Sequence, residues 1–144
     1  MKSASGILAL LGRLCLSFIF LTSAYSKMFG WNSNVQYIGT RHFTDPILVS
    51  LMIGGALVIE LGGALCLISG FQARVAGLVM AIYLTAVTLI FHKYWIITNE
   101  MARATMFMHF QKNLGIIGGL LMVAALGPGA WAIGGGRGSG GSRD

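Results

Sequence analysis

The sequence predicts an all-α integral membrane protein, a four-helix transmembrane bundle with a short interfacial helix between its first two spans. Hydrophobic residues make up 56% of the 144 residues and charged residues only 10%. A soluble domain carries about 25% charged residues. Four apolar runs each approach the ~20 residues that cross ~30 Å of hydrocarbon. These runs cover residues 6–28, 47–70, 75–97 and 105–126.

The first run follows Lys2, as the apolar part of a secretory signal peptide follows a basic residue. Arg13 interrupts its apolar stretch, however, and Ala24-Tyr25-Ser26 is a poor cleavage site. We therefore expect this run to remain in the protein as its first span.

The connection between the first two runs, residues 29–46, predicts the interfacial helix. Asn32 or Ser33 can cap its start, and Trp31 and Tyr37 suit the headgroup level of a bilayer. We expect this helix to lie on the membrane surface and to cover one end of the bundle.

Four spans place both ends of the chain on one side of the membrane, here called side A, with the connections 29–46 and 93–104 on the opposite side B. Lys and Arg residues occur in similar numbers on the two sides, so their bias alone does not orient the chain. Because several cations of side B can face a cavity, we expect cytoplasmic termini. One membrane domain, residues 1–128, should precede a flexible Gly-rich tail, residues 129–144.

Glu60 stands near the middle of an otherwise uncharged run, residues 46–70. A charged side chain at mid-membrane costs about 2.5–3.5 kcal/mol on insertion scales, so it is paired, protonated or turned toward a polar cavity. Counting about 1.5 Å per residue from side B places Arg13 and Glu60 at similar depths. We expect these two to form an ion pair, which either sets the charge of a functional site or only fixes the register of the helices.

Helical periodicity gives each span one face of mostly polar or small residues, and such faces pack inward in membrane bundles. In chain order the four faces are Arg13, Phe20, Ser23 and Lys27; Ala56, Glu60, Gly63 and Ala64; Arg74, Gly77, Ala81, Thr85, Thr88 and His92; and His109, Asn113, Ile116 and Leu120.

A second polar group gathers nearer side B, where the spans end or begin. Its members are Lys27, His92, Trp95, His109 and Asn113. Two His, one Lys and an amide supply hydrogen-bond donors and a proton acceptor at a depth that water reaches, and His can change charge near neutral pH. The alternative is an interfacial belt, in which the Lys side chains extend to the headgroups. His92 and His109 alone are weak evidence for haem, and we expect no metal site because no third ligand joins them.

The chain resembles the DoxX family of small four-helix membrane proteins over almost its whole length. The resemblance rests on Gly12-Arg13-Leu14 through Ser23, Ser26-Lys27-Met28-Phe29, Glu60-Leu61-Gly62-Gly63 with Gly70 and Arg74, Phe91-His92-Lys93-Tyr94-Trp95, Lys112-Asn113-Leu114 with Gly118-Gly119, and Gly127-Pro128-Gly129. The sequence departs from the family at Ala24, where a Gly is usual, and at its Gly-rich tail.

The resemblance implies a multi-pass protein of the bacterial inner membrane. Some DoxX-like proteins are subunits of a thiosulfate:quinone oxidoreductase. We therefore expect an integral membrane subunit of a quinone-linked redox complex that handles thiosulfate, thiols or related compounds. Its polar pocket would bind a quinone or a small anion. No covalently bound cofactor is expected, so any oxidoreductase activity depends on a quinone or on partner subunits. The lipid bilayer and those subunits are the expected partners, and nucleic acid is not.

Within this hypothesis the catalytic group is His92, Lys27 and Glu60, and the ligand-binding group is Arg13, Asn113, His109 and Trp95. Lys27 and Asn113 would hold the oxygens of the ligand, and His92 would relay protons. The alternative function is a non-catalytic accessory subunit that stabilises a larger membrane complex. A small transporter is less favoured, because the chain has neither an inverted repeat nor a broken helix.

Overall fold

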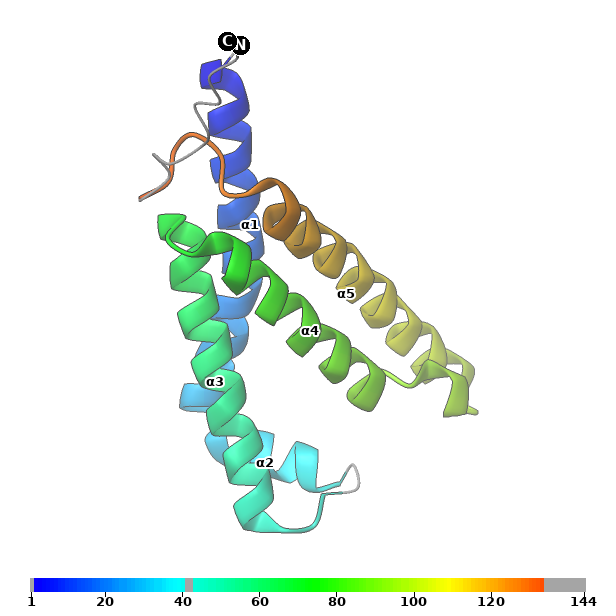
Figure 1. Cartoon of the computed structure of the whole chain (residues 1–144). Coiled ribbons are helices and arrows are strands. Elements are labelled where there is room, and N and C mark those ends of the chain that lie inside the picture. Colours follow the sequence, from blue (N-terminus) through cyan, green and yellow to red (C-terminus); the bar gives the residue numbers. More distant parts are fainter. Residues whose placement is uncertain (1, 41–42, 134–144) are drawn as a thin grey trace.

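The computed structural model describes residues 2–40 and 43–133, and within these residues all regular structure is helical. Figure 1 shows the arrangement of the helices. They are α1 (Lys2–Phe29), α2 (Trp31–Gly39), α3 (Pro46–Ser69), α4 (Ala73–Phe91), the short 3₁₀ turn η1 (Tyr94–Ile96) and α5 (Glu100–Leu126). The all-α fold class and the extra short helix after the first span are therefore confirmed.

Local sequence signals explain where α3 and α5 begin and where α3 ends. Asp45 caps α3 by accepting a hydrogen bond from the Ile47 N–H at 2.9 Å, with Pro46 as the first helical residue. Gly70 ends α3 with a φ of 77°, a conformation that glycine adopts without strain. Asn99 caps α5 through the Ala102 N–H.

The start of α2 differs from the prediction. The helix begins at Trp31 after Gly30, and neither Asn32 nor Ser33 caps it. The side chain of Asn34 instead donates to the Ser26 and Gly30 carbonyls, so that it holds α2 against the end of α1.

In the described part of the chain, three segments are long and apolar enough to cross a membrane: Ala4–Phe29, Pro46–Ser69 and Ala73–Ile96. The chain is thus a multi-pass membrane protein. The count of four spans is not matched in full, because α5 is as long as the others but carries His109, Gln111, Lys112 and Asn113 in its central part.

The helices form two pairs, with α1 packed against α3 and α4 packed against α5. Figure 1 shows the two pairs close together near the turn between α3 and α4 and spreading apart with distance from it. Glycines allow the close approach. A Cβ on Gly63 of α3 would lie 2.3 Å from the Met80 Sδ, and one on Gly77 of α4 would lie 2.9 Å from the Leu120 carbonyl oxygen.

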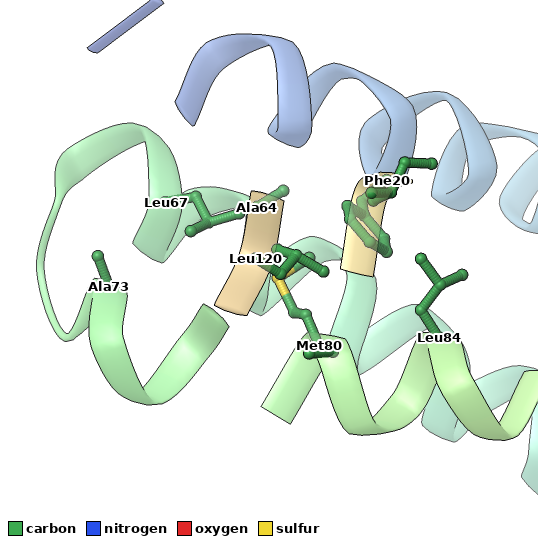
Figure 2. Close-up of a cluster of buried hydrophobic side chains, with 9 residues drawn as sticks. Phe20, Ala64, Leu67, Ala73, Met80, Leu84 and Leu120 are labelled. Atoms are coloured by element: carbon green, nitrogen blue, oxygen red, sulfur yellow. The ribbon is translucent and has the colours of Figure 1, made fainter. Parts of the chain in front are cut away.

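The end of the protein near the turn between α3 and α4 is called the closed end below. The apolar core lies near it and contains side chains from all four long helices. Figure 2 shows Phe20, Ala64, Leu67, Met80 and Leu120 turned toward one another. The predicted interior faces hold for α1, α3 and α5. On α4, Gly77, Ala81 and Thr88 are buried as predicted, whereas Arg74 and Thr85 are exposed.

The segment after α5 lies against the first helix. Ala9 is close to Gly129, and the Ile133 N–H donates to the Ser69 carbonyl at 2.8 Å. Most of the predicted tail, residues 134–144, lies outside the described residues, so the division at residue 128 stays a prediction.

Candidate functional site

A cavity of about 710 Å³ separates the two helix pairs on the side away from the closed end, and all five α-helices contribute to its walls. Its volume is that of a typical small-molecule site, about 300–1,000 Å³. Most lining side chains are apolar, such as Phe20, Ile59 and Ile116. Asn34, Tyr37 and Ile38 of α2 line its side B end, as expected for a helix that covers the bundle.

Glu60 forms the centre of the polar wall. It is almost fully buried, and its Oε1 accepts from the Ser23 hydroxyl at 3.0 Å, the Tyr83 hydroxyl at 2.7 Å and the Lys27 ammonium at 2.9 Å. Among the described residues, Lys27 alone donates to its Oε2, at 2.9 Å. The ion pair lets both charges remain inside the bilayer, where neither would be stable alone.

Lys27 reaches this carboxylate by pointing back along α1. Its ammonium donates to the Ser23 hydroxyl oxygen at 2.7 Å, one helical turn earlier, as long side chains in helices usually do. The three ammonium hydrogens are thus shared among Ser23 and the two Glu60 oxygens. Lys27 does not extend to the headgroups, and it has no donor left for the oxygens of a ligand.

Asn113 lies on the opposite wall, on α5. Its Nδ2 donates to the Thr88 hydroxyl oxygen at 3.0 Å, and that hydroxyl donates in turn to the Leu84 carbonyl at 2.6 Å. Asn113 is buried and lines the cavity. This hydrogen bond joins α5 to α4, so the position of the Asn113 side chain depends on how the two helices pack.

His92 also lines the cavity, whereas His109 and Trp95 do not. The His92 and His109 rings stack with centroids 5.6 Å apart and planes inclined by 21°. Stacked rings present their faces to each other, not two nitrogens to a shared iron, which argues against haem. Trp95 packs edge-on against Tyr94 and Phe110, in an aromatic cluster outside the cavity. Within the described residues no group of three or more His, Cys, Asp or Glu could hold a metal.

The predicted ion pair between Arg13 and Glu60 is wrong. The Arg13 guanidinium donates to the Leu67 carbonyl at 2.8 Å, to the Ile68 carbonyl at 3.2 Å and to the Trp131 carbonyl. The register of α1 against α3 places Glu60 opposite Ser23, about 15 Å along α1 from Arg13 at about 1.5 Å per residue. Arg13 is fully buried, does not line the cavity and joins three segments of the closed end.

Tyr83 is the cavity residue that the sequence analysis missed. Its hydroxyl makes the shortest of the hydrogen bonds to Glu60. A Tyr in the middle of an apolar span is itself a signal, because its hydroxyl needs a partner when water is absent. Tyr83 lies beside the stripe through Ala81 and Thr85, so the predicted interior face of α4 does not include it.

The rim of the cavity is apolar where it opens between α3 and α4. Leu51, Gly55, Ala86 and Ile90 line the cavity and are also exposed on the outer surface of the bundle. In a bilayer these residues face hydrocarbon. The exposed cation Lys112 of α5 also lines the cavity. An amphipathic molecule can thus enter laterally from the membrane.

Residues 3–135 match the model of the SURF4 family. The chain is similar to the inner membrane protein YphA of Escherichia coli, with 30% identity over 131 residues and 91% of each chain covered. It is 29% identical over 134 residues to YqjF of the same organism, covering 92% of this chain and 94% of YqjF. The ER-derived vesicles protein ERV29 of Saccharomyces cerevisiae is 26% identical over 130 residues, which are 90% of this chain and 34% of ERV29. No solved structure matches the chain significantly.

These matches correct two expectations. The quinone-linked redox subunit, with its accessory-subunit alternative, followed from the DoxX resemblance, and the family and relatives found here overturn it. The short motifs behind that resemblance consist largely of polar residues and glycines that many membrane helices share. Because the match extends over nearly the whole chain, this protein belongs to the SURF4 family and not to the DoxX family.

Proposed function

We propose that this protein is a binding protein of the bacterial inner membrane that takes a lipid laterally from the bilayer into the cavity between its two helix pairs. The observation that carries the proposal is the cavity itself, about 710 Å³ with mostly apolar walls and the polar groups of Ser23, Lys27, Glu60, Tyr83 and Asn113 turned into it. An apolar site with a few convergent polar groups suits an amphipathic ligand.

The inner membrane location is supported by the names of YphA and YqjF. We propose in addition that α5 is a fourth span. Its polar residues Asn113 and His109 turn inward or toward the α4 end, which lowers the cost of crossing the bilayer. Both termini then lie on one side, which we propose is cytoplasmic. Reporter fusions after residue 126 and within the connection between α4 and α5 test this topology, because opposite signals are expected from the two sites.

The binding proposal is tested by purifying the protein from membranes in mild detergent and identifying bound lipids by native mass spectrometry. Gly55→Phe fills the cavity from α3, and a Cβ there meets no atom within 4 Å, so the helix itself tolerates the change. We expect this variant to lose the bound lipid.

Gly62→Phe is the matched control. Gly62 lies on the same helix, is exposed, has the same free space at its Cβ and does not line the cavity. It should retain the lipid at the wild-type level. Loss from both variants, or from neither, would contradict the proposal. Partner chains that co-purify in stoichiometric amounts would appear in the same spectra, which tests the expectation of protein partners.

A further inference from the structure

The cavity has an unequal supply of hydrogen-bond donors and acceptors. The hydroxyl hydrogens of Ser23 and Tyr83 are directed to Glu60, and the Lys27 ammonium is used by Ser23 and Glu60. Glu60 Oε1 already accepts three hydrogen bonds, whereas Oε2 accepts only one. A carboxylate has about four lone-pair sites on its two oxygens, with Oε2 less used than Oε1. Oε2 of Glu60 can therefore accept a further hydrogen bond, whereas the donors of this polar wall already bond to other groups of the wall.

On the opposite wall, Asn113 likewise has an acceptor oxygen to spare while its Nδ2 already donates to Thr88. The Thr88 hydroxyl hydrogen goes to the Leu84 carbonyl, which can only accept. Thr88 Oγ1 must therefore accept from its other neighbour, and this requires Asn113 to turn its Nδ2 toward Thr88. The orientation leaves Asn113 Oδ1 as an acceptor with no hydrogen bond from the residues that the structure describes. The Asn113 side chain is one of those that line the cavity.

We infer that the ligand carries a primary ammonium group, received by Glu60 Oε2 and Asn113 Oδ1, together with a phosphate that Lys112 attracts at the rim, as in a zwitterionic aminophospholipid. The inference rests on the proposed function and names the headgroup of the lipid. A polar group that only accepts hydrogen bonds, such as the carbonyl of a quinone, would meet further acceptors there.

Lys27 already pairs with Glu60, so the headgroup is selected by the charge of Lys112 and by the spare acceptor oxygens of Glu60 and Asn113. Lys112 is exposed, so its attraction for an anionic lipid is screened and worth little. Glu60 and Asn113 are buried, and their spare oxygens gain more from an N–H donor, especially a charged one. The donor chemistry of the headgroup therefore outweighs its net charge. Lys27 and Glu60 form the one ion pair found within residues 2–40 and 43–133, which leaves Lys112 available for the phosphate.

The test compares short-chain dihexanoyl phospholipids that differ only in the headgroup, with binding to the purified full chain measured by equilibrium dialysis. Phosphatidylethanolamine and phosphatidylcholine have the same net charge, but only the first has N–H donors. We expect phosphatidylethanolamine to bind the wild-type protein about tenfold more tightly, the factor that one charged hydrogen bond supplies. Phosphatidylglycerol, an anion with hydroxyl donors, should bind less tightly than phosphatidylethanolamine.

Variants locate the preference within the cavity. Asn113→Leu removes the acceptor at similar size and should reduce the preference several-fold, whereas Asn113→Asp retains acceptor oxygens and should preserve or increase it. Lys112→Gln should weaken both lipids by a similar factor, and Gly62→Phe should change neither. Retained thermal stability of each variant shows that folding is intact.

Failure of this inference differs from failure of the proposed function. If both lipids bind equally, and Gly55→Phe abolishes both, the cavity binds lipid but does not select an ammonium group. Tighter binding of phosphatidylglycerol, or a preference that Asn113→Leu leaves unchanged, would also overturn the inference. If neither lipid binds, and Gly55→Phe has no effect on co-purified lipid, the function itself is wrong.

Discussion

Two cations of α1, the buried Arg13 and the partly buried Lys27, illustrate how differently the two ends of this protein are built. Arg13, at the closed end, contacts no carboxylate among residues 2–40 and 43–133 and donates to backbone carbonyls of α3 and of the segment after α5. Lys27, at the open end, pairs with Glu60 in the wall of a cavity. The closed end uses its charge to hold segments together, because carbonyls at a helix C-terminus need donors. The open end uses its charge to stabilise a carboxylate in the wall of the cavity.

The largest effect should come from Glu60→Leu. The change leaves the Lys27 ammonium and the Ser23 and Tyr83 hydroxyls without their common acceptor, and breaking a buried ion pair in this way costs about 3–5 kcal/mol. Adding Lys27→Met should recover most of the loss, since an apolar pair often replaces an ion pair at little cost. Free energies of unfolding in detergent for both single variants and the double variant measure this coupling. A loss in the double variant equal to the sum of the two single losses would show that the two charges act independently.

Arg13→Met should have the next largest effect and should differ from Glu60→Leu in kind. It removes three charged hydrogen bonds but also a buried cation without a carboxylate partner, so the net loss of unfolding free energy should be about 2–3 kcal/mol. The Ile133 amide should exchange faster with deuterium, because Arg13 holds the segment whose N–H bonds to Ser69. Unchanged protection of this amide would contradict the role of Arg13 at the closed end.

Combining Arg13→Met with Glu60→Leu also tests the ion pair between Arg13 and Glu60 that the sequence predicted. Arg13 and Glu60 are far apart, so the losses in Arg13→Met and Glu60→Leu should add to within about 0.5 kcal/mol in the double variant. A coupling above about 1 kcal/mol would favour the original pairing of Arg13 with Glu60.

The sequence predicts the helices well and their register poorly. Long apolar runs predict the four long helices, with ends that differ from the observed ones by up to six residues, and inward faces such as Asn113, Ile116 and Leu120 follow from periodicity. The position of a residue along one helix, however, does not determine the axial register between that helix and its neighbour. This register depends on contacts between helices, such as the one between the Ser17 hydroxyl and the Ala64 carbonyl, and the sequence pattern of a single helix does not reveal them.

The candidate site was predicted in part for the same reason. Glu60, Lys27, Asn113 and His92 line the cavity because an ionisable or amide group in an apolar span has to face the interior. The actual partner of Glu60 could not be predicted, since Lys27 reaches it by extending back along its own helix. The family assignment was wrong because it relied on short polar and glycine motifs rather than on the whole chain.

Two glycine substitutions, one at each end of the protein, should change the stability by smaller amounts. Gly77→Ala at the closed end forces a Cβ to within 2.9 Å of the Leu120 carbonyl oxygen and 3.3 Å of the Ala124 nitrogen, both backbone atoms that cannot turn aside. The expected cost is about 1–3 kcal/mol. Gly55→Ala at the cavity meets nothing and should gain up to about 1 kcal/mol from helix propensity. Thermal unfolding of the two variants in one detergent compares them, and equal stability would show that the closed end is not tightly packed.

Tyr83→Phe should have the smallest effect. It removes one of the four hydrogen bonds to Glu60 and leaves the ion pair with Lys27 intact, so the expected loss is about 1 kcal/mol. Tyr25→Phe is the matched control, because the Tyr25 side chain is exposed and packs on Phe29 through its ring, and its loss should stay within about 0.5 kcal/mol. In the Glu60→Leu background the Tyr83 hydroxyl has already lost its acceptor. Replacing it there should therefore stabilise the protein, since a buried donor without a partner is removed. A loss of the same size in both backgrounds would mean that the Tyr83 hydroxyl contributes independently of Glu60 and that the network around Glu60 ends at Ser23 and Lys27.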